Sequence, residues 1–482
     1  MRGNLFLEPE MTMPDRPNIL VLMPDTFRYD AMGCVTALVK TPCLDRLAGE
    51  GVRFAESFTV SPLCMPARAS VLSGVYVHNH CMWANRGELP ADDETFFHHL
   101  QRAGYQTAHV GKSHYYEHRG GHMREREPYL HARGIEYVHE TTGPWATCTT
   151  DSTLTDYLAE QGLLKTFRED YESRRGDPFR ATWPSPLPVE HHPDSYVGRQ
   201  AIEFLEKHTD GRPWCLFVGF GGPHDPWDAA GEFAELHDPA DMPPAIPAEA
   251  VPEVLSERAR RHLLNGRIPD ATDEEVAKLR ALYAGKVALI DHWVGRILDA
   301  VERMGQKENT VVIFWSDHGD FTGDHGRIHK TVFYEGALRV PLLVSWPGHV
   351  SVGVTSAAMV ENIDVFPTIL DAAGLEPSVR CPARSLMPVL TGSARAHRDV
   401  VLSEVRDWVC RTMMVRTRTH KYAMDGFGEG YMLFDVENDP TEQTNLIGRD
   451  DARELEADMR ELLLRELAAR QYVLRKGTAH LF

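Results

Sequence analysis

The segment at residues 18–23 reads NILVLM and is followed directly by Pro24 and Asp25. Its apolar residues do not alternate with polar ones, which is typical of a strand buried on both faces in a parallel sheet. Outward from it, strand-like runs recur at 52–60, 105–110, 213–220, 309–315 and 340–346, and helical patterns occur at 41–51, 67–72, 92–104, 194–208, 272–304 and 364–373. We therefore expect an α/β fold with a large, mostly parallel central sheet flanked by helices.

Beyond about Pro377 the pattern changes to short strand-like segments at 400–405, 412–417, 421–424 and 431–434, followed by an amphipathic helix at 450–473. This predicts a smaller antiparallel sheet with a helix, packed on the larger unit. The expected divisions are an N-terminal tail (1–16), a large α/β domain (17–376) and a C-terminal subdomain (377–482). Within the large domain, segments 115–193 and 228–270 are predicted to be inserts, the first an irregular lid or wall.

The composition excludes several classes of protein. The 482 residues include 51 Lys and Arg against 70 Asp and Glu, a net charge of −19, which disfavours a nucleic-acid or anionic-membrane partner. The eight cysteines form no C-x-x-C pair, which argues against a zinc ribbon or a dithiol redox site. No segment reads as a signal peptide or a membrane span, so we expect a cytoplasmic location. The first insert and the terminal helix are candidate subunit contacts in a homo-oligomer.

A second informative stretch is SPLCMPARAS at residues 61–70, which contains the pattern C-x-P-x-R. Pro66 suits a first helical turn, so Cys64 is expected at a helix N-terminus, where backbone N–H groups favour an anion. Arg68 follows one helical turn later and can present a planar set of donors to the same anion. The alternative interpretation is a buried cysteine that packs as a small apolar side chain.

Chemically related side chains follow the predicted strands: Asp25, Lys112 with His114, His224, and Asp317 with His318, and later Lys330. Strand ends on one edge of a parallel sheet converge, so these groups are expected to form a metal-assisted site for a tetrahedral oxyanion. Oxygen-dominated ligation favours Ca²⁺ or Mn²⁺, with Mg²⁺ less favoured. The simpler alternatives are helix caps for the aspartates, solvated lysines, and a loop hydrogen bond for His114.

These motifs, in this order from Pro17 to Asn445, resemble the sulfatase family, whose C-x-P-x-R cysteine is oxidised to the aldehyde formylglycine. The resemblance implies an alkaline-phosphatase-like sandwich, a hydrolase of sulfate esters, and a formylglycine-generating enzyme as maturation partner. The resemblance also implies roles for the residues of the site. The metal ligands would be Asp25, Asp317, His318 and modified Cys64, and Arg68 would hold the hydrated aldehyde. Lys112 and Lys330 would bind the substrate oxyanion, His114 would be the base that releases the product, and His224 would act at the leaving oxygen.

Two departures keep other functions open. Thr26 stands where the family usually has a second acid or amide, which leaves the metal identity open, and His318 stands where it often has Asn. A histidine there, with Asn79 of GVYVHNH (74–80) as an oxyanion contact, resembles the phosphonate monoester hydrolase and phosphodiesterase branch. The first alternative is therefore a hydrolase of phosphonate or phosphate esters, and the second is a non-catalytic binding protein that keeps Cys64 as a thiol.

Overall fold

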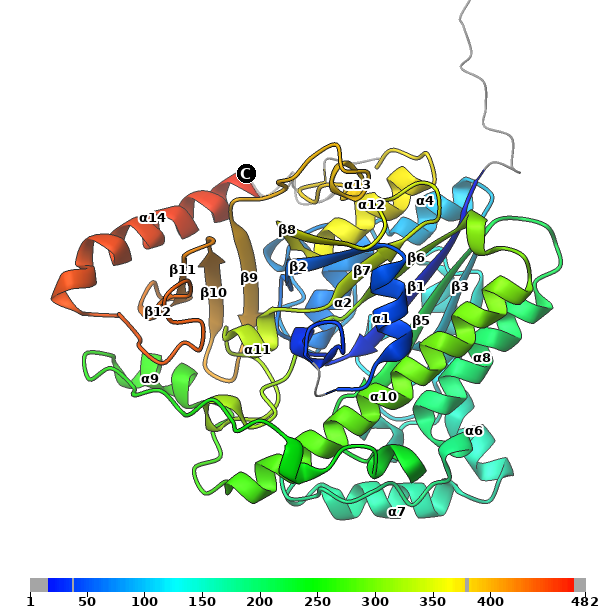
Figure 1. Cartoon of the computed structure of the whole chain (residues 1–482), viewed down its shortest axis with the longest axis horizontal. Helices are drawn as coiled ribbons and strands as arrows, with labels where there is room; N and C mark the ends of the chain where they lie inside the picture. Colours follow the sequence, from blue (N-terminus) through cyan, green and yellow to red (C-terminus); the bar gives the residue numbers. More distant parts are fainter. Residues whose placement is uncertain (1–15, 37–38, 378–380, 472–482) are drawn as a thin grey trace, which may run out of the picture.

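The computed structural model describes residues 16–36, 39–377 and 381–471. Its centre is a sheet with the strand order β4-β3-β5-β1-β6-β7-β2-β8 (Figure 1). The strands are β1 (Asn18–Asp25), β2 (Val52–Phe58), β3 (Gln106–Lys112), β4 (Tyr137–Thr141), β5 (Trp214–Pro223), β6 (Thr310–Trp315), β7 (Leu342–Ser345) and β8 (Val354–Glu361). Only β7 runs antiparallel to its neighbours β6 and β2, so the predicted large, mostly parallel sheet is confirmed.

Successive residues of β1 enter two different cores, as the unbroken apolar run predicts. Ile19 and Val21 pack with α2 (Cys64–Ser73), α4 (Phe96–Arg102) and α12 (Val365–Ala372) on one face. Leu20 and Leu22 pack on the other face with α1 (Pro42–Gly49), α8 (Pro193–Lys207) and α10 (Asp273–Arg303). Figure 1 shows these two helical layers on opposite sides of the sheet. Helices therefore cover both faces of the sheet. A ligand can bind only at the ends of the strands.

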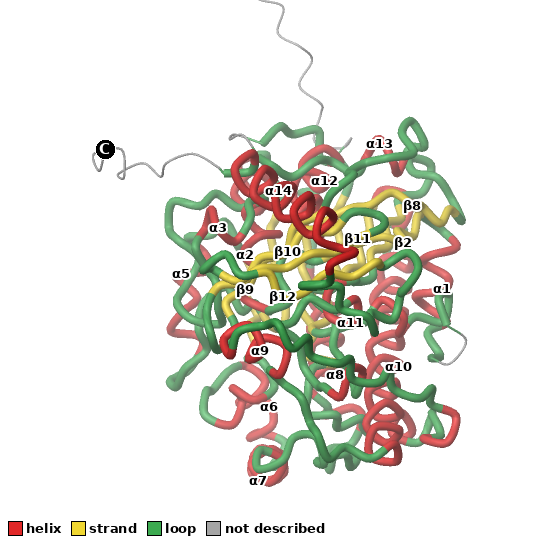
Figure 2. The backbone as a smooth tube through the Cα atoms, turned by 90° about the vertical axis from the view of Figure 1, so that its left-hand side faces the viewer, coloured by secondary structure: helices red, strands yellow, loops and turns green. Residues whose placement is uncertain are grey.

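The C-terminal part forms a second, antiparallel sheet in the order β12-β11-β10-β9, as predicted. Its strands are β9 (Val401–Arg406), β10 (Arg411–Arg416), β11 (His420–Asp425) and β12 (Gly430–Asp435). Helix α14 (Arg453–Ala469) packs on β10 and β11, and Figure 2 shows it lying across them. The boundaries proposed at 16/17 and 376/377 stay predictions.

The structure differs from the sequence-based expectations in two places. The segment 115–193 is not irregular, because it contains α5 (Glu127–His131), edge strand β4, α6 (Thr153–Glu160) and α7 (Leu164–Arg174). Strand β8 was not predicted, since the first half of this strand is largely exposed and lacks a strong apolar pattern. The second insert, 228–270, contains one short α-helix, α9 (Glu257–Leu264). Among the described residues, no helix combines the length and apolar character needed to cross a membrane.

Candidate active site at the strand ends

The predicted site residues meet at the carboxyl ends of the central strands and at the start of α2. Ligand atoms of Asp25, Cys64, Asp317 and His318 all lie within 4.8 Å of one another, and none of the four residues is exposed. Asp25 is the last residue of β1, Asp317 and His318 follow β6, and Cys64 opens α2 after β2. The convergence follows from strand order, since β1 and β6 are parallel neighbours.

Arg68 holds the two carboxylates of this cluster in place. Its Nη2 donates to Asp25 Oδ2 and its Nε donates to Asp317 Oδ2, each over 2.8 Å, while Nη1 donates to the Lys112 carbonyl oxygen over 2.8 Å. The side chain is fully buried, so these charge-assisted bonds act without competing water. Arg68 thus ties α2 to the ends of β1, β3 and β6.

Cationic side chains make the site favourable for an anion. Lys112 Nζ forms an ion pair with Asp25 Oδ2, and Lys330 Nζ lies 3.4 Å from Thr26 Oγ1. Burial and Asp25 raise the pKa of the Cys64 thiol, but Lys330, Lys112 and His318 outweigh them and hold that pKa well below its usual value. Residue 64 therefore occupies a position where negative charge is stabilised.

Thr26 supports the carboxylates. Its backbone N–H donates to Asp317 Oδ1 over 3.0 Å and its hydroxyl donates to Asp25 Oδ1 over 2.6 Å. The residue adopts φ of 70°, a left-handed conformation that is unusual for a β-branched residue. Its contacts orient two candidate ligands instead of supplying a second acid at this position.

The donor set fits a divalent metal ion. Two carboxylates and an imidazole face one buried point, and His318 Nδ1 donates to the Gly319 carbonyl oxygen over 2.9 Å, which directs Nε2 toward Cys64 Sγ at 3.2 Å. Metal-binding histidines commonly donate their second ring N–H to a carbonyl or carboxylate in this way. Hard oxygen donors with one imidazole suit Ca²⁺, Mn²⁺ or Mg²⁺.

Two further histidines face Cys64 and have opposite protonation preferences. Burial and Lys112 lower the pKa of His114 to about 4, although Cys64 opposes this shift. For His224, burial and Lys330 lower the pKa, but Asp225 and Cys64 outweigh them and raise it to about 9. At neutral pH one imidazole is therefore neutral and the other is protonated.

The sequence analysis assigned no role to Asp225 or Trp145, and both support His224. Asp225 Oδ1 lies 2.9 Å from His224 Nδ1, and Trp145 Nε1 donates to Asp225 Oδ2 over 2.5 Å. The sequence PHDP at residues 223–226 places Asp225 directly after His224, and this pattern could have indicated a role for Asp225. No sequence pattern indicated a role for Trp145, because it belongs to the segment that was predicted to be irregular.

Asn79 lies in the short helix α3 (Val77–His80), where its Nδ2 donates to the carbonyl oxygen of Arg470 over 3.2 Å. The role of Asn79 as an oxyanion contact stays a prediction. Close approach of β3 and β5 beside the site requires Gly219, because a Cβ there would lie 2.3 Å from the Lys112 carbonyl oxygen.

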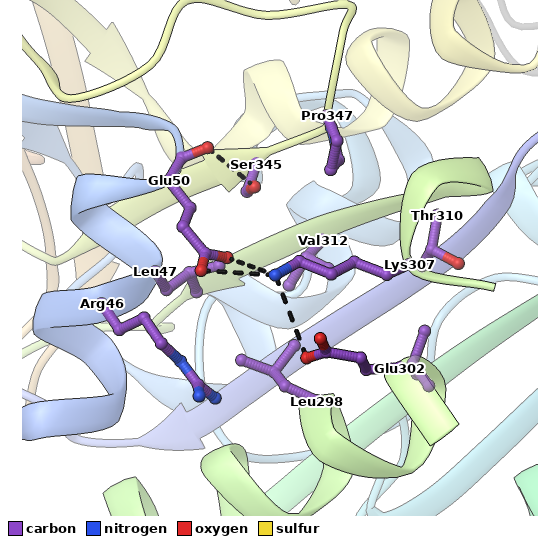
Figure 3. A pocket seen from close by; sticks show the side chains of 11 residues that line it. Arg46, Leu47, Glu50, Leu298, Glu302, Lys307, Thr310, Val312, Ser345 and Pro347 are labelled. Carbon is purple, nitrogen blue, oxygen red and sulfur yellow. Dashed lines mark hydrogen bonds and ion pairs between the residues drawn. The ribbon is translucent and has the colours of Figure 1, made fainter. Parts of the chain in front are cut away.

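A polar cavity of about 400 Å³ adjoins the site through His118. The His118 ring lies 4.9 Å from that of His114, and the cavity wall also includes Glu117, Arg119 and Arg126. A second pocket, shown in Figure 3, lies at the opposite end of β6 beside Thr310. Its volume is only about 30 Å³, and Lys307 lies between Glu50 and Glu302, so it has room for little more than water.

Comparisons with known proteins agree with this geometry. The family model described as Sulfatase matches residues 17–375, and the model for the C-terminal region of N-sulphoglucosamine sulphohydrolase matches residues 323–469. The chain is 29% identical to an arylsulfatase of Clostridium perfringens, with 95% of each chain covered. It is 30% identical to a choline-sulfatase of Rhizobium meliloti, covering 89% of this chain and 82% of that one. The solved phosphonate monoester hydrolase of Agrobacterium radiobacter has a TM-score of 0.78 at 25% identity, covering 95% of this chain and 96% of that chain.

Proposed function

Because this chain belongs to the sulfatase family, we propose that it hydrolyses sulfate esters at the head of α2, with formylglycine made from Cys64 as the nucleophile. The observation that carries the proposal is the meeting of Cys64 with Asp25, Asp317 and His318 within 4.8 Å. Four further side chains surround the same point and can act on a bound tetrahedral anion: Lys112, Lys330, His114 and His224.

The chain's own residues divide the reaction between them. Lys112 and Lys330 bind the substrate oxyanion and stabilise the charge that develops during transfer. His224, protonated at neutral pH with a pKa of about 9, donates its proton to the leaving alkoxide oxygen. His114, neutral with a pKa of about 4, accepts the proton whose removal releases inorganic sulfate. Two imidazoles with opposite pKa shifts thus supply the acid and the base.

Residue 64 and the metal supply what these side chains lack. A hydrated aldehyde at position 64 offers one hydroxyl to attack sulfur and a second whose deprotonation breaks the bond to the product. A divalent ion held by Asp25, Asp317 and His318 would supply Lewis-acid charge beside the reacting group. We propose Ca²⁺ or Mn²⁺ for it, because carboxylate oxygens dominate the donor set.

The cavity beside His118 supports a polar leaving alcohol. Its wall carries both acidic and basic side chains, including Glu117 and Arg119, and it also includes His118, whose ring lies 4.9 Å from that of His114. A hydroxylated or charged alcohol would keep these groups hydrogen-bonded, whereas a large apolar one would leave them desolvated. Polar sulfate esters are therefore expected to give the higher kcat/KM.

The decisive experiment combines mass measurement with turnover. In protein purified from its native host, the peptide carrying Cys64 should have the mass of formylglycine. Cys64→Ala should reduce hydrolysis of 4-nitrophenyl sulfate by at least 10³-fold, since it removes the nucleophile. Cys81→Ala is the matched control, because that cysteine is exposed and should leave turnover unchanged. Activity of Cys64→Ala within tenfold of wild type would remove residue 64 from the mechanism, and an unmodified thiol would favour a binding protein.

The metal ligands can be tested separately. Asp317→Asn keeps the side-chain shape but removes one of the buried carboxylates, so we expect metal content after dialysis to fall at least tenfold. Metal content is measured by inductively coupled plasma mass spectrometry, and circular dichroism checks the fold. Full metal content together with full activity in this variant would exclude Asp317 as a ligand.

A second candidate function is hydrolysis of phosphonate monoesters or phosphodiesters at the same site. It is supported by His318 in place of Asn and by similarity over nearly the whole chain to the Agrobacterium radiobacter enzyme. Aryl sulfate, phenylphosphonate and aryl phosphodiester should be compared with one preparation. A kcat/KM for phenylphosphonate more than tenfold above that for the sulfate would make this second function the main one.

Maturation and location complete the proposal. A formylglycine-generating enzyme would be the partner that converts Cys64. The cysteines, all of which lie in the described part of the chain, are unpaired, which favours a reducing compartment such as the cytoplasm.

A further inference from the structure

A second group of metal-binding side chain types lies at the edge of the C-terminal sheet. Ligand atoms of His262, Cys410 and Asp425 lie within 4.8 Å of one another. His262 belongs to α9, Cys410 immediately precedes β10, and Asp425 ends β11. Helix α9 packs against β12, on the side of the molecule that Figure 1 shows at lower left. The three segments come from separate parts of the chain.

The orientation of His262 leaves one ring nitrogen directed into the group. Its Nδ1 donates to Asp407 Oδ2, and Asp407 Oδ1 accepts from the backbone N–H of Cys410 over 3.0 Å. The ring is 1% exposed and stacks on Tyr431 at a centroid distance of 4.9 Å. With Nδ1 engaged, Nε2 faces Cys410 Sγ at 3.7 Å and Asp425 Oδ2 at 3.9 Å. A histidine held by a carboxylate on its far nitrogen is the usual arrangement at metal sites.

We propose that His262, Cys410 and Asp425 bind a divalent transition-metal ion, with zinc preferred. Metal–ligand bonds of 2.0–2.3 Å in a tetrahedral zinc site separate ligand atoms by about 3.3–3.8 Å. The observed separations of 3.7 and 3.9 Å need only a small contraction to reach that range. A thiolate with an imidazole selects zinc over the hard cations that suit the Cys64 site.

The site has one competitor for its carboxylate. Arg258 Nε donates to Asp425 Oδ2 over 2.5 Å, but its Nη2 also donates to Glu429 Oε2 over 2.8 Å. The Arg258 side chain is 37% exposed, so it can turn toward Glu429 and water when a metal takes Asp425 Oδ2. Asp425 Oδ1 accepts from the backbone N–H groups of Phe427 and Glu429, which keeps Oδ2 directed at His262.

A metal bound here would join α9 to the C-terminal sheet through three protein ligands. Cys410 is partly exposed, so water can complete a tetrahedron. The ligands lie outside the Cys64 cluster and share no residue with it. The inference is therefore independent of the proposed hydrolysis.

Cobalt substitution tests the site, because a cobalt–thiolate bond gives an intense charge-transfer absorption that oxygen ligands do not give. The full chain carrying Cys64→Ala is titrated with Co²⁺, so that residue 64 cannot contribute a thiolate. We expect the absorption to saturate by two equivalents, because the carboxylate site at Asp25 and Asp317 can take up one ion without giving a thiolate absorption, and to disappear when two equivalents of Zn²⁺ are added.

Adding Cys410→Ala to the Cys64→Ala chain should abolish the absorption, whereas adding Cys81→Ala should leave it unchanged. His262→Gln gives a second check, and circular dichroism verifies that each variant folds. No thiolate absorption in Cys64→Ala, its persistence after Cys410→Ala, or its equal loss with Cys81→Ala would overturn the proposal.

Discussion

Lys286, in the middle of α10, anchors the loop that carries His224. Replacing this lysine should lower both the stability of the fold and the turnover. Its Nζ donates to the carbonyl oxygens of His224 over 2.9 Å and Pro226 over 2.8 Å, and to Asp228 Oδ1 over 2.7 Å. Lys286 and Asp228 have side-chain exposures of 2% and 0%. Lys286→Met keeps the aliphatic stem but leaves a buried carboxylate without its cation.

Breaking a buried ion pair from one side costs about 3–5 kcal/mol. The hydroxyl of Tyr171 still donates to Asp228 Oδ2 over 2.9 Å, which limits the loss. We therefore expect the free energy of unfolding of Lys286→Met to fall by about 4 kcal/mol at pH 7. Because the His224 loop loses two anchoring bonds, turnover should also fall by about 10- to 100-fold.

The loss should depend on pH. Burial raises the pKa of Asp228, but Lys286, His192 and Arg174 together outweigh it and hold that pKa below its usual value. The wild-type pair thus stabilises the fold above the unfolded-state pKa of about 4, and this contribution is lost as the pH falls toward the folded-state pKa. In Lys286→Met, His192 and Arg174 remain to oppose burial, but the loss of Lys286 should raise the pKa of Asp228, so the deficit relative to wild type should be largest at pH 7 and about halved at pH 4.

Urea-induced unfolding followed by far-UV circular dichroism measures these differences. Adding Asp228→Asn to Lys286→Met should recover about half of the loss, because the uncompensated charge is removed. Lys278→Met is the control on the same helix, since its ion pair with Glu274 is exposed and its loss should leave the free energy of unfolding nearly unchanged. A loss below about 1 kcal/mol in Lys286→Met, or no recovery in the double variant, would show that the buried ion pair does not stabilise the fold.

Two further predictions concern stability. Burial raises the pKa of Glu140 to about 8, although hydrogen bonds from Ser113 and Tyr116 oppose this shift. The free energy of unfolding of the wild type should therefore fall by about 3 kcal/mol between pH 5.5 and 8.5. Urea titrations should show a smaller pH dependence for Glu140→Gln. An unchanged slope would remove Glu140 as its source. In α8, a Cβ on Gly198 would lie 2.4 Å from the Trp293 ring, so Gly198→Ala should destabilise by about 1–3 kcal/mol in thermal unfolding. Gly49→Ala, where the new Cβ meets nothing within 4 Å, should not, and equal effects of the two would contradict the packing argument.

Prediction from sequence succeeded where one chemical pattern determines one structural outcome. The run at 18–23 had to be buried on both faces, and polar side chains after such strands had to share an edge, which brought Asp25 and Asp317 together. Strand β8 could not be predicted, because its first half is largely exposed and therefore lacks the apolar pattern of a buried strand. The contact of Trp145 with Asp225 joins segments 80 positions apart and depends on tertiary packing that no local pattern contains.

The complete burial of Cys64 limits when the proposed conversion to formylglycine could occur. A second protein cannot reach a sulfur atom enclosed by strand ends and by the first turn of its own helix. The proposed conversion would therefore compete with closure of the sheet, and the time between synthesis and closure would set the yield of converted protein. Expression at lower temperature, which lengthens that interval, should raise the converted fraction, whereas incubation of already folded chains with the converting enzyme should leave it unchanged.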